Sequence, residues 1–462
     1  MGFGLHGWGV GVVNWLVKHG ARVTVTDLKT AAQLAPMLKK VDQKKIKLVL
    51  GRHRVQDFLR ADLVFQNPGV PRDSKYLKIA KHSGAGFEND ASLFIKNCIG
   101  KVIGVTGTRG KSTTASLIYE MLRNHKSKIT NPKQIQNSKF KTFLAGLPQM
   151  PLLGILDKVR ADDLAVLELS SWQLEILGRQ KLSPSVAVIT NIYPDHLNRY
   201  RGMADYIAAK ANIIKFQKPN DICVLNRDNA ETKKLGQKVR GRRFWFSTDF
   251  FPEENGAFVK AGYIYWRLNG RTAKICGVKE LKLLGKHNLE NALAAVAAGG
   301  ILGVAPATMR QGLKSFKGLP FRNELIRERQ GVKFVNDTTA TTPDGTLAAL
   351  KTLPPKTVVL IAGGDFKNIP DAKYQALARL IAKTCQAVVL FKGRGSRQIL
   401  KFLKIKNLVS EVGTMAEAVG LANNFARVGD TVLLSPACAS FNLFVNEYDR
   451  GEQFNKIVAK LK

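Results

Sequence analysis

The chain has 462 residues, of which 45% are hydrophobic and 23% are charged, values that predict several folded domains and exclude large-scale disorder. Its five cysteines form no C-x-x-C pair, which argues against a disulfide framework or a zinc cluster and indicates a reducing, cytoplasmic setting. No apolar stretch is long enough for a bilayer span and no secretory signal is visible, so we expect no membrane span.

The net charge is the unusual property of the composition. The 72 Lys and Arg residues outnumber the 35 Asp and Glu residues, giving a formal charge of +37. Such a charge makes nucleic acid a candidate partner, but the basic residues are scattered and form no arm or tail. We therefore favour a lysine-rich solvated surface, which would also attract anionic substrates, and expect no nucleic-acid partner.

The first predicted domain, residues 1–99, alternates short apolar runs with helical stretches, which is an α/β pattern. Gly2–Gly7 fits G-x-G-x-x-G, and Asp27 ends the next strand-like run, where a dinucleotide-binding fold places a ribose-binding acid. A glycine turn of this kind normally follows a buried strand, and none fits before Gly2. We therefore expect that the natural start lies upstream or that this domain is weakened.

The second predicted domain, residues 100–318, begins with the strand-like run Lys101–Thr106, which enters a glycine loop and then the helical stretch Ser112–Arg123. Backbone N–H groups and a helix N-terminus in this arrangement cradle phosphates, although Val105 stands where the strict P-loop has its first glycine. Lys111 would reach the terminal phosphates and the Ser112 hydroxyl would bind Mg²⁺. The loop therefore predicts an ATP site formed by Gly107, Thr108, Arg109, Gly110, Lys111, Ser112 and Thr113.

Two more strand-like runs of this domain lead into ionisable residues, one at Glu168 and one shortly before His196. Sites in parallel sheets gather at the carboxyl ends of strands, so both residues are expected near the loop. The third predicted domain, residues 319–462, again shows strand runs that end in small or polar residues, with helices between them. The sequence thus predicts an α/β fold of three domains, Rossmann-like at both ends around a central P-loop ATPase-type domain.

Thr106–Ser112 also matches the shorter pattern T-G-T-x-G-K-[ST], which resembles the phosphate loop of the Mur ligases and folylpolyglutamate synthetases. Three further segments resemble that family in the same order, namely Glu168–Glu175, Thr190–Leu197 and Tyr206–Lys210. The resemblance implies that Glu168 and His196 hold a second Mg²⁺ and that Lys210 is carbamylated, because a carbamate offers oxygen ligands that an amine lacks. The implied metal ligands are Ser112, Glu168, His196 and Lys210, and the implied catalytic residues are Lys111, Glu168, His196 and Lys210.

The resemblance also implies residues for the nucleotide and the substrates. Beyond the phosphate loop, those for ATP are Asn288, Asn291, Arg322 and Asp337. Those for the UDP part of a substrate, which we prefer to an NAD site, are Leu5, His6, Asp27, Leu28, Lys29, Asn67, Pro68 and Gly69. Leu434–Phe441 and Gly363–Lys367 closely resemble segments of the family members that add D-glutamate. The implied D-glutamate residues are Thr341, Lys367, Ser440 and Phe441.

By this resemblance the chain is expected to be an ATP-dependent amide-bond-forming ligase of peptidoglycan precursor synthesis. It would phosphorylate the carboxylate of UDP-N-acetylmuramoyl-L-alanine, and the amine of D-glutamate would attack the acyl phosphate. We expect a cytoplasmic monomer that uses two Mg²⁺ ions. Thr339, Leu147 and Glu447 depart from the family pattern and put substrate contacts in question. Two alternatives are another ligase of the family with a different acceptor, and a basic P-loop ATPase that binds nucleic acid.

Overall fold

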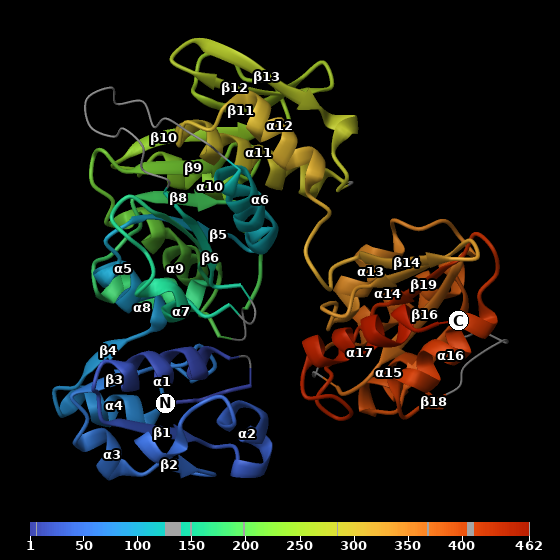
Figure 1. Ribbon diagram of the computed structural model, residues 1–462, viewed down its shortest axis with the longest axis horizontal. Coiled ribbons are helices and arrows are strands. Elements are labelled where there is room, and N and C mark those ends of the chain that lie inside the picture. Colours follow the sequence, from blue (N-terminus) through green and yellow to red (C-terminus); the bar gives the residue numbers. More distant parts are fainter. Residues whose placement is uncertain are drawn as a thin grey trace. The chain divides into compact units, whose positions relative to one another are not determined.

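The computed structural model describes residues 1–5, 7–124, 140–147, 150–196, 199–283, 285–366, 369–403 and 411–461. These residues form two compact units, a first unit Met1–Phe316 and a second unit Lys317–Lys462 (Figure 1). Two residues predicted to bind substrates, His6 and Lys367, lie outside the described residues. Within the described ranges, no helix has both the length and the apolar character needed to cross a membrane.

The N-terminal part of the first unit, residues 1–88, contains two small parallel sheets. β1 (Val23–Asp27) pairs with β2 (Ile46–Leu50), and β3 (Leu63–Phe65) pairs with β4 (Gly86–Glu88). The helical elements around them are α1 (Trp8–Lys18), α2 (Ala31–Leu38), the 3₁₀ turn η1 (Gln43–Lys45), α3 (Val55–Leu59) and α4 (Lys75–His82). This arrangement confirms the α/β pattern predicted from the sequence.

Backbone hydrogen bonds of the first two residues link the two sheets. Met1 N donates to Phe65 O at 2.9 Å, Asn67 N donates to Met1 O at 3.1 Å, and Gly2 N donates to Thr26 O at 2.8 Å. A cavity of about 1180 Å³ adjoins these two residues and is lined by β1, β3, α1 and α3. Burial lowers the pKa of the Met1 ammonium to about 6.

The larger part of the first unit is built on a nine-stranded sheet, with the order β13-β12-β11-β10-β9-β8-β5-β7-β6 among the described residues. All neighbours are parallel except at one edge, where β12 is antiparallel to both β11 and β13. The strands are β5 (Lys101–Thr106), β6 (Thr142–Ala145), β7 (Leu164–Glu168), β8 (Val186–Ile189), β9 (Ile222–Asn226), β10 (Arg242–Ser247), β11 (Gly256–Lys260), β12 (Tyr263–Leu268) and β13 (Arg271–Gly277). Because β5 lies between β7 and β8, the loop after β5 sits where the strand order reverses, which is where open α/β sheets bind ligands.

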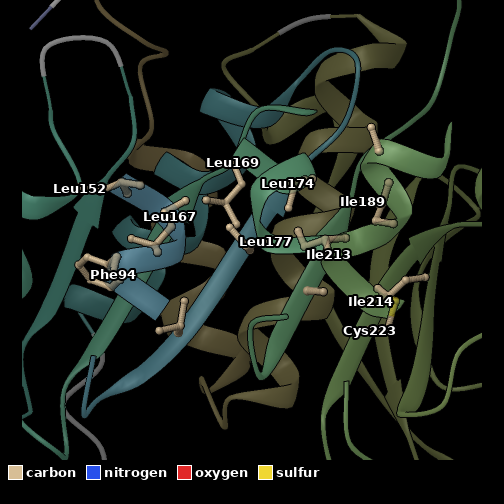
Figure 2. Close-up of a cluster of buried hydrophobic side chains, with 14 of the residues drawn as sticks. Phe94, Leu152, Leu167, Leu169, Leu174, Leu177, Ile189, Ile213, Ile214 and Cys223 are labelled. Atoms are coloured by element: carbon tan, nitrogen blue, oxygen red, sulfur yellow. The ribbon is translucent and has the colours of Figure 1, made fainter. Parts of the chain in front are cut away.

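Helices cover this sheet and bury its apolar side chains. They are α5 (Asp90–Asn97), α6 (Lys111–Arg123), α7 (Leu153–Leu156), α8 (Ser171–Arg179), α9 (Met203–Lys215), α10 (Ala230–Gly236), the turn η2 (Val278–Glu280), α11 (Lys286–Ile301) and α12 (Pro306–Ser315). Phe94 of α5 is fully buried in the same core as Leu167, Leu177 and Ile189 (Figure 2). Figure 1 places α5 beside α7 and α8, which it contacts. The predicted boundary between residues 99 and 100 stays a prediction, as does the one near residue 318.

The second unit carries a six-stranded sheet with the order β14-β15-β19-β16-β17-β18 among the residues described. β14 is antiparallel to β15 and the other neighbours are parallel. Its elements are β14 (Glu324–Arg329), β15 (Val332–Asn336), α13 (Pro343–Leu350), β16 (Val358–Gly363), α14 (Asp371–Thr384), β17 (Cys385–Phe391), α15 (Arg394–Leu400), β18 (Glu411–Val412), α16 (Met415–Phe425), β19 (Thr431–Leu434) and α17 (Glu447–Ala459). Two apolar clusters, one around Phe334 and one around Leu360, form its core. The predicted Rossmann-like α/β character of this end is confirmed.

Candidate active site

The loop after β5 has two positions that exclude any side chain. A Cβ on Gly107 would lie 1.8 Å from Thr190 Oγ1, and one on Gly110, whose φ is +80°, would lie 2.1 Å from Asn291 Oδ1. The loop is anchored by Asn191, whose backbone O accepts from Thr108 N at 2.8 Å and whose Oδ1 accepts from Arg109 N at 2.9 Å. α6 then begins at Lys111, so its first N–H groups and the positive end of its dipole face the loop. The local geometry is that of an anion cradle.

Two side chains predicted for phosphate and Mg²⁺ lie together at the start of α6. Lys111 Nζ donates to Thr108 O at 3.2 Å, so the ammonium folds back over the loop. Ser112 Oγ donates to Glu168 Oε2 at 2.6 Å, which ties the loop to the end of β7. A hydroxyl and a carboxylate are hard oxygen ligands of the kind Mg²⁺ prefers.

His196 lies on the segment that follows β8. Its side chain is 43% exposed, and its ring centroid lies 5.3 Å from that of Trp172. Burial lowers the pKa of His196, the Asp195 carboxylate opposes that shift, and the charge of Lys111 adds to it. The imidazole is therefore neutral at pH 7, which is the form that binds metals.

Lys210 lies on α9 and is deeply buried, with 2% of its surface exposed. Its Nζ donates to Gly107 O at 2.7 Å and lies 4.8 Å from the ring centroid of Tyr206. Burial lowers the pKa of the Lys210 amine well below its ordinary value, and the neighbouring charge of Lys111 adds to this, while Asp195 and Glu168 oppose it. The amine thus loses its proton far more readily than a surface lysine.

A metal ion at this site would need ligands beyond the ordinary acidic side chains. Among the described residues, no group of three or more His, Cys, Asp or Glu side chains is placed to hold one. Mg²⁺ characteristically uses one or two carboxylates together with phosphate oxygens and water. The Ser112–Glu168 pair beside a phosphate cradle suits that pattern.

The two asparagines predicted for the adenine side lie one helical turn apart near the start of α11. Asn291 is buried and accepts a hydrogen bond from Thr114 Oγ1 at 3.3 Å, so it closes the loop opposite Gly110. Asn291 Nδ2 also donates to Asn288 Oδ1 at 3.4 Å, and Asn288 is partly exposed. Asn291 therefore supports the loop, whereas Asn288 stands where a ligand could reach it.

In the second unit, Asp337 follows β15 and is buried. Ser435 Oγ donates to its Oδ2 at 2.7 Å and Asn323 N donates to its Oδ1 at 3.3 Å. Burial raises the pKa of Asp337 to about 7, although these hydrogen bonds and the charge of Arg322 oppose the rise. Arg322 itself is exposed. Of the two residues predicted for ATP in this unit, only the arginine is open to a ligand.

The residues predicted for D-glutamate occupy two segments of the second unit. Thr341 is partly buried, and Phe441 is 50% exposed. Ser440 is buried, and its Oγ has no hydrogen-bond partner among the described residues. Arg450, fully buried on α17, holds these segments in place, since its Nε and one terminal nitrogen each donate to Thr338 at 2.9 Å and the other donates to Cys438 O at 3.4 Å. No sequence pattern had predicted this role for Arg450.

The residues predicted for UDP surround the loop of residues 2–5. Asp27 Oδ2 accepts from Gly4 N at 3.0 Å and its Oδ1 accepts from Lys29 N at 2.9 Å. This buried carboxylate therefore fixes the backbone of the loop. Leu28 is 66% exposed. Asn67 lies beside the same loop, because a Cβ on Gly4 would be 3.2 Å from Asn67 Nδ2. Apart from His6, which is outside the described residues, the predicted set is thus brought together.

The three departures from the family pattern have local partners. Thr339 Oγ1 donates to Phe321 O at 2.9 Å, and Leu147 O accepts from Met150 N at 2.9 Å. The backbone O of Glu447 accepts from Thr338 Oγ1 at 3.0 Å.

Three residues for which the sequence predicted no role, Arg72, Glu175 and Arg199, form a charged network.

Three family models match the chain in succession. The N-terminal domain of MurD-like Mur ligases matches residues 1–87, the Mur ligase middle domain matches residues 105–299, and the Mur ligase glutamate ligase domain matches residues 321–438. Among solved structures, the UDP-N-acetylmuramate–alanine ligase of Thermotoga maritima covers 100% of this chain and 98% of its own, with a TM-score of 0.62 and 20% identity. That likeness concerns the fold.

Curated relatives are similar over their full length. UDP-N-acetylmuramoylalanine–D-glutamate ligase of Roseiflexus sp. (strain RS-1) is 40% identical over 99% of this chain and 97% of the relative. The protein of the same name from Symbiobacterium thermophilum is 36% identical over 98% of this chain and 97% of the relative. With this similarity and the geometry of the phosphate loop, the chain belongs to the Mur ligase family.

Proposed function

We propose that this chain is an ATP-dependent ligase that joins the carboxyl group of UDP-N-acetylmuramoyl-L-alanine to the amine of D-glutamate. The observation that carries the proposal is the full-length similarity, at 40% and 36% identity, to two proteins named UDP-N-acetylmuramoylalanine–D-glutamate ligase. The phosphate loop, with Ser112 and Glu168 paired beside Lys111, supports the ATP-dependent step.

In the proposed reaction, a carboxylate oxygen of the alanine attacks the γ-phosphorus of ATP, giving an acyl phosphate and ADP. The D-glutamate amine then attacks the acyl carbon, phosphate leaves with the electron pair of the C–O bond, and the nitrogen loses a proton. The transferred group is negatively charged throughout, so the chain has to position it and neutralise its charge. Lys111 and the N-terminus of α6 are suited to this in the first unit, and Arg322 and Asp337 are the proposed ATP residues of the second.

The proposed metal ligands are Ser112, Glu168, His196 and Lys210, the last as a carbamate. Mg²⁺, when bound, supplies positive charge that polarises phosphate oxygens. The hydroxyl–carboxylate pair and a histidine whose pKa is lowered by burial support the assignment of the first three.

Burial supports carbamylation of Lys210. A carbamate forms when a neutral amine adds CO₂, making an N–C bond and releasing one proton, and burial lowers the pKa of this amine. The product would place negative charge near Lys111, and its remaining N–H would retain a donor for Gly107 O, now 2.7 Å from Nζ. Two carbamate oxygens would add to the oxygen ligands available to Mg²⁺.

The remaining site residues are proposed by group. For ATP, the first unit contributes Gly107, Thr108, Arg109, Gly110, Lys111, Ser112, Thr113, Asn288 and Asn291. For the UDP end of the substrate, we propose Leu5, His6, Asp27, Leu28, Lys29, Asn67, Pro68 and Gly69. For D-glutamate, we propose Thr341, Lys367, Ser440 and Phe441. We also propose a cytoplasmic monomer; the five cysteines are free thiols, which supports a reducing compartment.

One substrate-panel assay tests the proposal. The purified chain is given ATP, Mg²⁺ and UDP-N-acetylmuramoyl-L-alanine with D-glutamate, L-glutamate, L-lysine, diaminopimelate or D-alanine, and phosphate release is measured. D-Glutamate should give the highest rate. Faster coupling of another amino acid would refute the proposed acceptor, and ATP hydrolysis stimulated by DNA but not by the nucleotide substrate would favour the nucleic-acid alternative.

A variant of the phosphate loop tests the ATP step. Lys111→Ala should abolish turnover without unfolding the chain, because its ammonium contributes charge and little packing. Lys101→Ala is the matched control, since Lys101 is an exposed lysine at the start of β5, the strand that leads into the loop. Wild-type turnover in Lys111→Ala would contradict the role proposed for the loop.

A further inference from the structure

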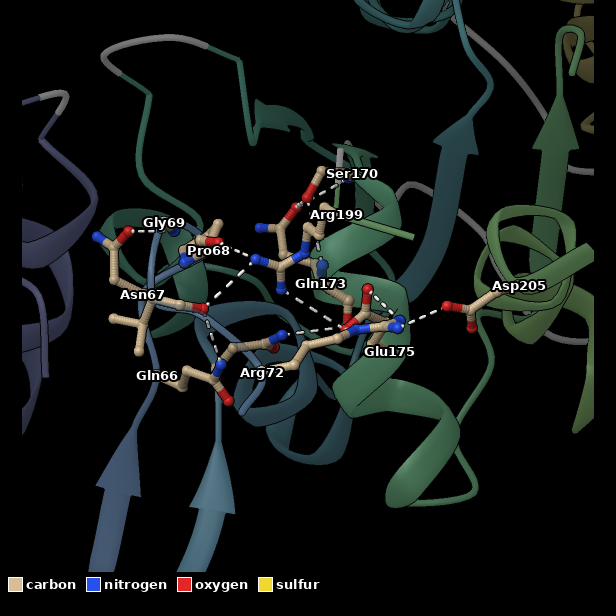
Figure 3. Close-up of polar contacts among 12 residues, drawn as sticks. Gln66, Asn67, Pro68, Gly69, Arg72, Ser170, Gln173, Glu175, Arg199 and Asp205 are labelled. Atoms are coloured by element: carbon tan, nitrogen blue, oxygen red, sulfur yellow. Dashed lines mark hydrogen bonds and ion pairs between the residues drawn. The ribbon is translucent and has the colours of Figure 1, made fainter. Parts of the chain in front are cut away.

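A charged network joins the N-terminal part of the first unit to the central sheet (Figure 3). Arg72 contacts the carboxylate of Glu175 through two nitrogens. Its Nε donates to Oε2 at 2.7 Å, and one terminal nitrogen forms an ion pair with Oε1 at 2.7 Å. Its other terminal nitrogen donates to Asp205 Oδ2 at 2.8 Å. Arg72 comes from the segment after β3, whereas Glu175 is on α8 and Asp205 is on α9.

A second arginine enters the same network from the segment after β8. One terminal nitrogen of Arg199 donates to Pro68 O at 2.9 Å and lies 3.4 Å from Val70 O, and the other lies 3.7 Å from Glu175 Oε2. Its guanidinium lies 4.9 Å from the ring centroid of Trp172. Arg199 therefore binds the backbone of the Asn67–Val70 loop directly. The carboxylate of Glu175 lies between the two arginines and pairs with both.

The degree of burial separates these contacts from ordinary surface ion pairs. The side chains of Glu175 and Arg199 are 8% and 15% exposed, and that of Arg72 is 29% exposed. Charge-assisted, two-point contacts of this kind fix geometry, and a lysine cannot reproduce them because its single nitrogen cannot hold two directions at once. Removing one partner would leave a partly buried charge without its match.

The elements that the network connects are those proposed to bind opposite ends of one substrate. Asn67, Pro68 and Gly69 are proposed for the UDP end. Arg199 follows His196 by three residues, and α8, which carries Glu175, begins three residues after Glu168. The network thus spans from the nucleotide loop to the segments that hold the phosphate site.

We propose that Arg72, Glu175 and Arg199 are positioning residues that set the distance between the nucleotide loop and the phosphate loop. The proposal rests on the ligase function proposed above, in which a long substrate is bound at its UDP end and reacts at its far carboxylate. Reactive geometry is sensitive to small shifts, a displacement of about 1 Å costing on the order of a hundredfold in rate. A loop freed from Arg199 would bind the UDP end in several positions, few of which present the carboxylate to ATP.

Arg199→Met is the main variant, because a methionine side chain keeps much of the length and apolar packing of arginine while it removes the guanidinium. Arg201→Met is the control: Arg201 is an exposed arginine two residues away, and the same charge is lost. In Arg199→Met, the KM for UDP-N-acetylmuramoyl-L-alanine should rise about tenfold or more with a fall in kcat, while the KM for ATP stays within about twofold. Arg199→Lys should fall between this variant and wild type.

Two further measurements distinguish positioning from general stability. The effects of Arg199→Met and Glu175→Gln should multiply only in part in the double variant, because both variants change the Arg199–Glu175 pair at 3.7 Å while each also affects a contact of its own. In the intact chain without ligand, amide exchange at Asn67 and Val70 should be about tenfold faster in Arg199→Met and unchanged in Arg201→Met. Equal rises in the KM for ATP and for the nucleotide, or unchanged exchange in the loop, would overturn the proposal.

The outcomes also separate this proposal from the ligase function. If wild type couples D-glutamate and Arg199→Met keeps the wild-type KM for the nucleotide, only the positioning role fails. If wild type neither couples D-glutamate nor binds UDP-N-acetylmuramoyl-L-alanine in calorimetry, both proposals fail. If wild type binds the nucleotide but couples a different acceptor, the acceptor is wrong and the positioning role is judged by nucleotide affinity in Arg199→Met.

Discussion

Replacing Asp337 by asparagine should change how the stability of the second unit depends on pH. Burial raises the pKa of this carboxyl from 3.8 to about 7. The folded state therefore binds the proton more tightly than the unfolded state, so wild type is stable at pH 4 and loses stability as pH rises toward 7. Above about pH 8 the carboxyl is ionised in both states, so the free energy of unfolding no longer changes with the titration of this group. An asparagine side chain does not titrate, so Asp337→Asn should lack this slope.

The size of the effect follows from the shift. A rise of about three pKa units corresponds to about 4 kcal/mol in total, at roughly 1.4 kcal/mol per unit. Integrated between pH 5 and pH 8, the wild-type free energy of unfolding should fall by about 2–3 kcal/mol relative to that of the variant. The variant's free energy of unfolding at any one pH can differ from that of wild type for another reason, because asparagine keeps an acceptor for only one of the bonds from Ser435 and Asn323.

The assay has to report on the second unit alone. All five tryptophans, Trp8, Trp15, Trp172, Trp245 and Trp266, lie in the first unit, so tryptophan fluorescence cannot follow the second. Hydrogen exchange of β16 and β19, whose residues are buried, gives the free energy of opening at each pH after correction for intrinsic exchange rates. Fluorescence-monitored unfolding should coincide for both proteins and serves as the control. An identical pH slope in wild type and Asp337→Asn would refute the reasoning.

Two further results are expected. Lys210→Ala should lose most activity and recover part of it with a short carboxylic acid at high concentration, whereas a native mass without added CO₂ would argue against a carbamate. Gly110→Ala should abolish ATP binding measured by calorimetry, because its Cβ would lie 2.1 Å from Asn291 Oδ1; Gly84→Ala has a similar φ of +85° with open space around it and should bind ATP normally.

Local patterns in the sequence predicted much of the fold and the phosphate loop. The order of strand, glycine loop and helix around Lys111 is contained in a short stretch, so it can be read directly. The pairing of Ser112 with Glu168 follows from a rule, since parallel strands end at the same edge of a sheet. The burial of Lys210 had no signal of its own, because a chain with 72 basic residues has many helix lysines that look alike.

The parts that could not be predicted depend on contacts between distant segments. Arg72 and Glu175 are 103 residues apart, and nothing in either local sequence marks them as partners. The role of Asp27 was also hidden, because its carboxylate accepts bonds from Gly4 and Lys29 and so shapes the loop itself. The antiparallel edge formed by β12 depends on three-dimensional pairing that periodicity alone does not give.

The N-terminal part of the first unit rests on two sheets of two strands each among the residues described, β1 with β2 and β3 with β4. Two-stranded sheets are marginal in water, so these strands should open before the nine-stranded sheet does. A nucleotide that binds the loops after β1 and β3 would act as a folding ligand, stabilising this region in proportion to the logarithm of its concentration. Purification and crystallisation should therefore depend on it more strongly than on ATP.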